Sequence, residues 1–168
     1  MKMLRVVFEN RIVYAIVRAL LLVNAKFSWF KSHLKMRSLI KSVGRKSFCH
    51  WTTEIKFGKN ISIGYHTSIG PYSCIGAMSP VTIGSYVRIS RGVVIETAGL
   101  NLLVPPPYPH ISKPIIIEDG VWIASNAIIL GGVRIGANSI IGAGAVVTKN
   151  VEAGSIVVGQ AARKLVKS

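Results

Sequence analysis

The hexads IEDGVW, IASNAI, ILGGVR, IGANSI and IGAGAV follow one another without a gap over residues 117–146, and Val147 begins the next one. Toward the N-terminus the same period continues to Phe57, and twelve of the thirteen first positions are isoleucine or valine. The first positions are Phe57, Ile63, Ile69, Ile75, Ile83, Ile89, Ile95, Ile117, Ile123, Ile129, Ile135, Ile141 and Val147. An aliphatic residue at every sixth position predicts a side chain that faces an interior, and the small residue that usually follows it permits a tight corner.

This period predicts a parallel β-helix, in which each coil buries its apolar side chains only by stacking on its neighbours. Three hexads make one triangular coil, so thirteen hexads predict a little over four coils. The phase breaks twice. Between Ile75 and Ile83, Ser79 and Pro80 fit a bulged corner. The longer break, residues 98–113, contains four prolines that cannot continue a sheet ladder, so we expect a protruding loop there, where binding and catalysis are often located.

The composition indicates a folded chain with a basic N-terminal appendage. A hydrophobic content of 50% over 168 residues is enough for a core and excludes a disordered or collagen-like chain. The formal net charge of +15 predicts anionic partners, and it is concentrated in residues 1–50. Two cysteines, Cys49 and Cys74, favour a reducing cytoplasm over a disulfide framework. We therefore expect a helical appendage (1–54), a β-helix domain (55–158) and a basic tail (159–168).

The appendage contains a predicted basic, amphipathic helix. At helical spacing an apolar stripe forms, and we place Arg11 and Arg18 on the other side. The stripe consists of Leu4, Phe8, Ile12, Ala15, Ala19 and Leu22. With the aromatic and basic residues that follow, it predicts peripheral contact with an anionic membrane, and capping of the open end of the β-helix is a compatible alternative. The uninterrupted apolar run is too short for a spanning helix, Arg18 argues against a secretion signal, and no nucleic-acid-binding motif is present.

Three motifs carry a family resemblance. They are KPIIIEDGVWI at Lys113–Ile123, IGAGAVVTK at Ile141–Lys149 and VGQAAR at Val158–Arg163. In this order and spacing the chain resembles, over about residues 55–165, the hexapeptide-repeat acyltransferases such as the maltose, galactoside and polysaccharide O-acetyltransferases. The resemblance implies an all-β fold with a left-handed parallel β-helix. It also implies a homotrimer with its active sites between subunits, acetyl-CoA as acyl donor and no required metal.

The resemblance further implies site residues. Family positions that contact acetyl-CoA correspond here to Trp122, Ser125, Ala143, Thr148, Lys149 and Arg163. A backbone N–H near Ser125 would face the developing oxyanion, and Lys149 and Arg163 would meet the phosphates of CoA. Each residue also has a purely structural interpretation, with Trp122 covering a corner and the two basic side chains solvated. In the family a loop histidine deprotonates the acceptor hydroxyl, which then attacks the thioester directly.

At this histidine the sequence departs from the family. The maltose and galactoside enzymes have a Gly-His pair where the loop leaves the β-helix, and the equivalent pair here is Gly99 and Leu100. We assign the general base to His110, which is the only histidine in the loop. His66 is the next candidate. Glu96, on the last strand before the loop, is a carboxylate that could orient an imidazole.

The sequence thus predicts acetyl-CoA-dependent O-acetylation of a sugar hydroxyl, in the synthesis of capsule, lipopolysaccharide or exopolysaccharide. The protein would act in the cytoplasm or at the inner face of the membrane. Two alternatives stay open: N-acetylation of a nucleotide-linked amino sugar, and a non-catalytic β-helix scaffold, which the missing Gly-His pair motivates. A β-helix carbonic anhydrase would need three histidines on a metal ion, and the repeat region holds only His66 and His110.

Overall fold

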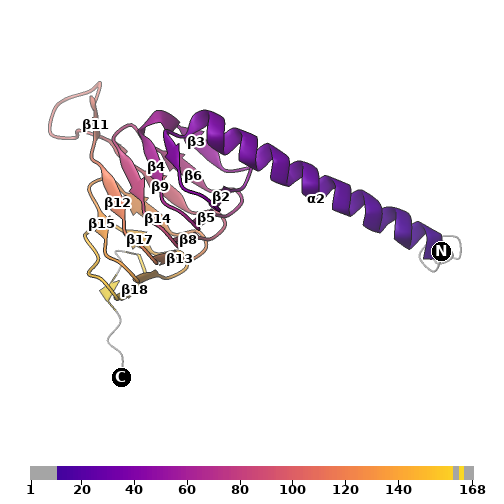
Figure 1. Ribbon diagram of the computed structural model, residues 1–168. Coiled ribbons are helices and arrows are strands. Elements are labelled where there is room, and N and C mark those ends of the chain that lie inside the picture. Colours follow the sequence, from indigo (N-terminus) through magenta and orange to yellow (C-terminus); the bar gives the residue numbers. More distant parts are fainter. Residues whose placement is uncertain (1–10, 161–162, 165–168) are drawn as a thin grey trace, which may run out of the picture.

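The computed structural model of the chain describes residues 11–160 and 163–164. A long helix projects from a stack of short strands, which form three flat faces of one solenoid (Figure 1). The helix is α2 (Arg11–Leu39), and a 3₁₀ turn, η1 (Gly58–Asn60), lies between the third and fourth strands. The parallel β-helix expected from the hexads, with its N-terminal helix, is confirmed.

Each coil gives one strand to each of three sheets. The first sheet is β1 (Ser42–Val43), β4 (Ile61–Ile63), β7 (Val81–Ile83), β12 (Ile115–Ile117) and β15 (Arg134–Ile135). The second is β2 (Phe48–Cys49), β5 (Ser68–Ile69), β8 (Arg88–Ile89), β13 (Trp122–Ile123), β16 (Ile140–Ile141), β18 (Ile156–Val158) and β19 (Arg163–Lys164), the last pairing antiparallel. The third is β3 (Glu54–Lys56), β6 (Cys74–Gly76), β9 (Val94–Glu96), β14 (Ile128–Leu130) and β17 (Val146–Val147).

Three corners join the sheets. The first corner leads from the first sheet to the second, the second corner from the second sheet to the third, and the third corner back to the first sheet. With the exception of Phe57, the first position of each hexad points into the solenoid and stacks in register. Ile75, Ile95 and Ile129, for example, are partners on neighbouring strands and are fully buried. Strands in a sheet lie about 4.8 Å apart, so each isoleucine packs between those of the coils above and below.

Buried hydroxyls explain why the fifth hexad position is small. Thr67 Oγ1 donates to the carbonyl of Gly84 (2.7 Å) and accepts a hydrogen bond from the N–H of Val87 (3.1 Å), both in the next coil. Ser47 Oγ bonds Gly64 and Thr67 in the same way one coil earlier. These hydroxyls satisfy backbone groups that the corner would otherwise leave buried without a partner.

The start of the β-helix differs from the sequence-based expectation. Phe57 is 62% exposed and has a φ of 56°, so its assignment as the first inward position is wrong. Ile55 takes that position instead and pairs with Ile75. The first coil begins at β1, before residue 55, and its inward residue on β2 is Cys49, which is buried but not aliphatic and therefore escaped the hexad count.

Helix α2 contacts the β-helix only near its C-terminal end. Ser32 and Met36 are its buried residues, and the helix lies against β1 and β2. Lys35 anchors this end, because its Nζ donates to the carbonyl oxygens of Trp51 (3.0 Å) and Thr53 (2.7 Å). The C-terminal end of α2 thus covers the first coil, whereas the stripe residues Ile12, Ala15, Ala19 and Leu22, which were the ones expected to cap it, are exposed.

The amphipathic stripe is not confirmed. Leu4 and Phe8 lie outside the described residues, and Ala15 and Leu22 each follow an arginine, Arg11 or Arg18, by four residues and so share its face. Exposed apolar side chains surround the helix instead. By length and composition α2 could cross a membrane, because the helix continues through the aromatic segment after the apolar run.

Residues 98–113 form the expected protrusion, and it is a β-hairpin. Strands β10 (Ala98–Leu100) and β11 (His110–Ser112) pair antiparallel and leave the solenoid at the third corner (Figure 1). The tip of the hairpin is exposed, with Leu103 at 95%.

Replacing Ile129 by alanine should lower the free energy of unfolding by about 2–5 kcal/mol, because a fully buried side chain is removed from a stack that cannot collapse around the gap. Denaturant unfolding measures this. The control Leu103→Ala removes an exposed side chain and should change stability by no more than about 0.5 kcal/mol. Equal effects of the two substitutions would contradict the stacked core.

Candidate functional site

The hairpin places His110 opposite Leu100, the position at which the family has its histidine. His110 is the cross-strand partner of Leu100, and the N–H of Asn101 donates to the carbonyl of Pro109 (2.9 Å). Directly opposed residues of an antiparallel pair project from the same face, with Cβ atoms roughly 4.5–5.5 Å apart. The imidazole of His110 and the side chain of Leu100 therefore occupy one site, and both residues are exposed.

Polar contacts fix the root of the hairpin. Glu96 accepts a hydrogen bond from the N–H of Ala98 (3.0 Å), and Ser79 Oγ lies 2.5 Å from Ser112 Oγ. The N–H of Lys113 donates to the carbonyl of Thr97 (3.0 Å). Glu96 thus holds the first residue of β10. It makes no contact with His110 among the described residues, so its expected role in orienting an imidazole is not supported by this geometry.

A row of outward backbone N–H groups runs along the second corner. Ser125 and Ala143 occupy equivalent positions in successive coils, and within the described residues their N–H groups have no hydrogen-bond acceptor. The residues after them bond normally: the N–H of Asn126 donates to Arg91 and that of Gly144 donates to Ser125 (both 3.0 Å). The corner therefore presents unpaired donors to the surface, which suits an oxygen that gains negative charge.

The same corner has a sharply defined backbone. Tyr72, Gly92, Asn126 and Gly144 all have φ between 58° and 68°. A positive φ at the second central residue is typical of a type II turn, in which proline is favoured at the residue before it. Pro71 occupies that place in the second coil, where Ser125 stands in the fourth. The geometry that exposes the N–H of Ser125 is thus a property of the corner and does not depend on its side chain.

Trp122 lies beside this corner. It is 49% exposed on β13, and its Nε1–H donates to Ser90 Oγ (3.3 Å). Trp122, Ser125 and Ala143 are therefore brought together at the second corner and its approach. A half-exposed indole next to free backbone donors can cover a flexible chain that binds along the corner.

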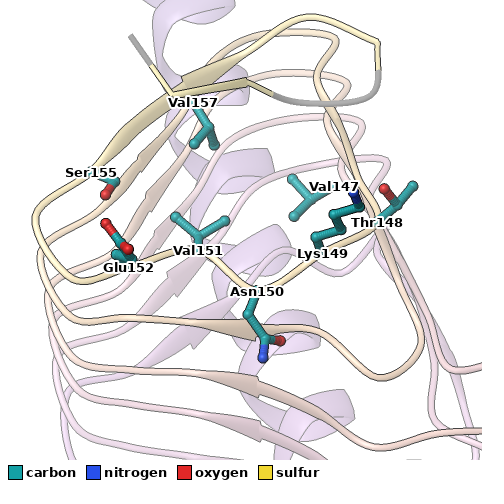
Figure 2. A pocket seen from close by; sticks show the side chains of 8 residues that line it. All are labelled: Val147, Thr148, Lys149, Asn150, Val151, Glu152, Ser155 and Val157. Atoms are coloured by element: carbon teal, nitrogen blue, oxygen red, sulfur yellow. The ribbon is translucent and has the colours of Figure 1, made fainter. Parts of the chain in front are cut away.

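Thr148 and Lys149 do not lie at the second corner but at the end of the third sheet that leads to the third corner. They follow β17 and, with Val147, Val151, Glu152 and Val157, surround a hollow at the open C-terminal end of the solenoid (Figure 2). Three of the eight residues that line this hollow are valines and the other five are polar. The expected contact of Lys149 with the phosphates of CoA stays a prediction. The side chain of Arg163 lies outside the described residues, which leaves its expected phosphate contact a prediction.

His66 lies at a different corner from the hairpin. It has a φ of 55° at the first corner and stacks on Tyr86, with ring centroids 5.2 Å apart and planes 14° apart. Tyr65 contacts both rings. This aromatic cluster gives His66 a packing role. The hairpin with His110 leaves the solenoid at the third corner, on the other side of the first sheet from His66.

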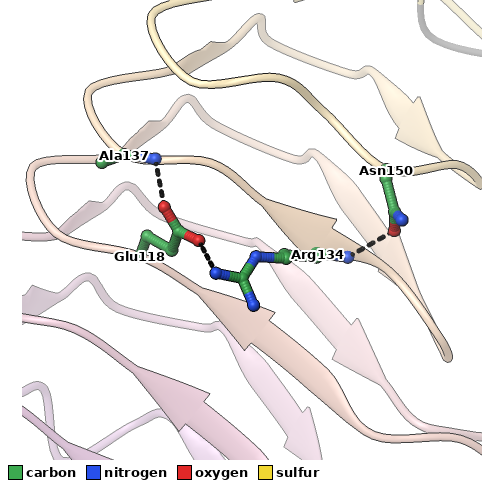
Figure 3. Close-up of polar contacts among 4 residues, drawn as sticks. All are labelled: Glu118, Arg134, Ala137 and Asn150. Atoms are coloured by element: carbon green, nitrogen blue, oxygen red, sulfur yellow. Dashed lines mark hydrogen bonds and ion pairs between the residues drawn. The ribbon is translucent and has the colours of Figure 1, made fainter.

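The carboxylates of the KPIIIEDGVWI motif serve the coil itself. Glu118 accepts a hydrogen bond from the N–H of Ala137 (2.8 Å) and pairs with Arg134, whose own N–H donates to Asn150 (Figure 3). Asp119 accepts from the N–H of Ser85 (2.7 Å). Both acids accept hydrogen bonds from backbone donors of adjacent coils, so these two residues of the motif stabilise the fold and are not candidates for catalysis.

Neither cysteine is suited to covalent catalysis. Burial raises the pKa of Cys49, and burial followed by the charge of Glu54 raises the pKa of Cys74. Both therefore remain thiols near neutral pH, and the thiolate is the nucleophilic form. The described part of the chain contains no group of three metal-ligating side chains.

Comparison with known proteins agrees with this geometry. Residues 114–149 match the family model "Bacterial transferase hexapeptide (six repeats)". A hexapeptide-repeat acetyltransferase of Vibrio cholerae O1 biovar eltor, solved with acetyl coenzyme A, is 37% identical, with a TM-score of 0.75 over 79% of this chain and 74% of that one. The chain belongs to the hexapeptide-repeat acetyltransferases.

Other relatives differ in the chemistry of their acceptor. A maltose O-acetyltransferase from Clostridium difficile 630 is 30% identical, with a TM-score of 0.73 over 77% of this chain and 71% of that one. A tetrahydropyridine-dicarboxylate N-acetyltransferase from Staphylococcus carnosus (strain TM300) is 44% identical over 82 residues, 49% of this chain and 31% of the relative. The chain spans about a third of the length of the curated relatives it matches.

Two features of the site escaped sequence analysis. The cross-strand pairing of His110 with Leu100 depends on the hairpin register, which the proline-rich tip conceals. The row of donors at the second corner was expected only near Ser125, and its extension had a detectable signal, because Ala143 is the third residue of its hexad, as Ser125 is. Arg91 is also a third residue; it is exposed at this corner, and its guanidinium lies 5.8 Å from the centroid of the Tyr72 ring.

Proposed function

We propose that this hexapeptide-repeat acetyltransferase transfers an acetyl group from acetyl-CoA to a sugar hydroxyl during synthesis of a surface polysaccharide. The observation that carries the proposal is the pairing of His110 with Leu100, which supplies an imidazole where the sequence lacks the family's Gly-His pair. A scaffold that had lost its activity would have no reason to retain an imidazole at this rung. The match to a maltose O-acetyltransferase over most of both chains supports a hydroxyl acceptor.

The proposed mechanism is direct transfer. The imidazole of His110 removes the proton from the acceptor hydroxyl as its oxygen attacks the thioester carbonyl carbon. The resulting oxyanion is stabilised by backbone N–H groups of the second corner, at Ser125 or Ala143. The C–S bond then breaks, CoA leaves as a thiolate, and the imidazolium returns the proton to it. No acyl-enzyme is required, in keeping with the raised pKa of both cysteines.

This mechanism supports a homotrimer. The hairpin leaves at the third corner, whereas the free donors lie at the second, and the six residue steps from Ser125 to Gly131 separate the two corners by roughly 20 Å of extended chain. A hydrogen bond reaches only about 3 Å. His110 of one subunit would therefore act with the second corner of its neighbour, and a closed ring of three subunits repeats that contact at each interface.

The second candidate is N-acetylation, which the curated relatives favour. A neutral amine is itself a nucleophile and depends less on a general base than a hydroxyl does. Purified protein assayed with acetyl-CoA and matched hydroxyl and amino sugars separates the two. We expect turnover of the hydroxyl acceptor, and exclusive turnover of the amino sugar would select the alternative.

Replacing His110 by alanine should lower turnover by about 10²- to 10⁴-fold, the usual contribution of a positioned base. Adding Leu100→His to this variant should restore at least part of the loss, because the new imidazole projects from the same face of the same rung. Initial rates at saturating acetyl-CoA measure both changes. His66→Ala is the control, since it removes a ring that packs on Tyr65 and Tyr86 at the first corner. Near-normal turnover of His110→Ala would rule out the assignment.

Replacing Ser125 by proline should leave the corner intact, because Pro71 already occupies the equivalent place in the second coil. The substitution removes an N–H that bonds nothing within the described residues. If that N–H meets the oxyanion, turnover should fall by about 10²- to 10³-fold. Ser125→Ala retains the N–H and should be close to wild type. Equal rates for the two variants would exclude this N–H as the oxyanion donor.

A further inference from the structure

The exposed part of α2 has no polar face. Its apolar side chains include Leu20, Leu21, Leu22 and Val23, four consecutive residues that are 57–65% exposed. Successive residues of a helix point about 100° apart, so these four alone cover the whole circumference. A helix that is apolar all round is normally buried in a large protein or in a membrane. The most apolar 18-residue window of α2 is 0% buried here.

The length of this exposed segment fits a bilayer. From Ile12 to Phe30 the helix has nineteen residues, which rise roughly 28 Å. The hydrocarbon core of a bilayer is about 30 Å thick. The segment ends where Ser32 and Met36 become buried against the first coil, so the β-helix begins immediately outside that thickness.

Aromatic and basic side chains mark the boundary beside the β-helix. Phe27, Trp29 and Phe30 are each 56–57% exposed. Lys31 Nζ lies 3.8 Å from the centroid of the Trp51 ring and 4.9 Å from that of Phe27. Aromatic side chains at headgroup level, with lysine and arginine beyond them, are typical of the cytoplasmic end of a spanning helix.

Arg18 and Lys26 are the charges within the segment Ile12–Phe30. Lys26 lies four residues from its end, where the lysine stem can reach the interface, so Arg18 is the main cost of insertion. One arginine in mid-span costs about as much as the insertion of some six to eight leucine, isoleucine or valine side chains gains. Eight such residues lie between Arg11 and Asn24, namely Ile12, Val13, Ile16, Val17, Leu20, Leu21, Leu22 and Val23. The free energy gained by inserting these eight side chains therefore equals or exceeds the cost of Arg18. The long arginine stem can also reach toward the interface. A helix lying flat on the surface would need a distinct polar face, which α2 lacks.

We propose that α2 crosses the lipid bilayer as a single span and holds the β-helix against the cytoplasmic surface. The basic flank, with Lys31, Lys35, Arg37 and Lys41, places the β-helix on that side. The bilayer is favoured over a second copy of the chain because the apolar surface surrounds the helix, whereas a helix–helix contact needs only one stripe. This goes beyond the proposed function, which specifies the reaction and not the anchoring.

The test uses the full-length chain in bacterial membranes. After washing with high salt and then with alkaline carbonate, the protein should remain in the membrane pellet, and detergent should release it. Release by salt or carbonate would show peripheral binding and overturn the proposal. Recovery in the soluble fraction as an oligomer would also overturn it, because a second copy would then cover the helix. Acetyl transfer assayed in detergent is a separate readout, so failure of the anchor and failure of the proposed reaction are distinguishable.

Two substitutions sharpen this test. Leu21→Glu should increase the carbonate-released fraction at least several-fold, and the matched control Leu103→Glu, at the exposed hairpin tip, should not. Unchanged acetyl transfer in detergent would show that Leu21→Glu still folds. For binding to anionic vesicles, Arg18→Leu should match or exceed wild type if α2 inserts. If charge at the surface holds the helix, the same substitution should weaken binding about fivefold, and that result would overturn the proposal.

Discussion

The stacking of inward aliphatic side chains is the constraint on which the rest of this structure depends. A coil of three short strands encloses too little volume to bury Ile75 or Ile129 alone, so every coil needs one above and one below it. Stacking requires the corners to repeat in register, and the repeated corner gives the N–H groups of Ser125 and Ala143 no acceptor in the part of the chain that the structure describes. The same constraint leaves the first coil open, and Met36 of α2 and Ile40, the residue after the helix, are buried there.

The site therefore consists of a rigid part and an exposed part. The second corner is fixed by the core behind it, whereas His110 stands on a hairpin that only a few contacts root, among them Glu96 with Ala98 and Ser79 with Ser112. A rigid donor row suits the developing charge, because preorganised donors need not move as the oxyanion forms. An exposed hairpin suits an acceptor whose shape varies. In the trimer that we propose, the two parts would come from different subunits.

The sequence predicted the sheets because one physical period, an inward residue every sixth position, extends through the repeat. It failed at Phe57 because an aromatic residue looks apolar in sequence but here stands outside the coil, with Ile55 inside. The sequence identified His110 by elimination, but it did not predict that His110 pairs with Leu100. The register of the hairpin is set by backbone pairing in a segment that has no repeat. The prediction of an apolar stripe in α2 was not confirmed because residues four apart share a face of a helix, which places Leu22 on the same face as Arg18.

The central claim is that acetyl-CoA binds along the second corner, beside the hairpin of a neighbouring subunit. Amide hydrogen exchange of the intact protein, with and without CoA, tests this most directly. Ligand binding should slow exchange at Ser125 and Ala143 by about tenfold or more, because free N–H groups gain acceptors, and should slow exchange in the hairpin. The first corner, at Tyr65 and His66, should not change. Protection at the first corner with none at Ser125 and Ala143 would contradict the account.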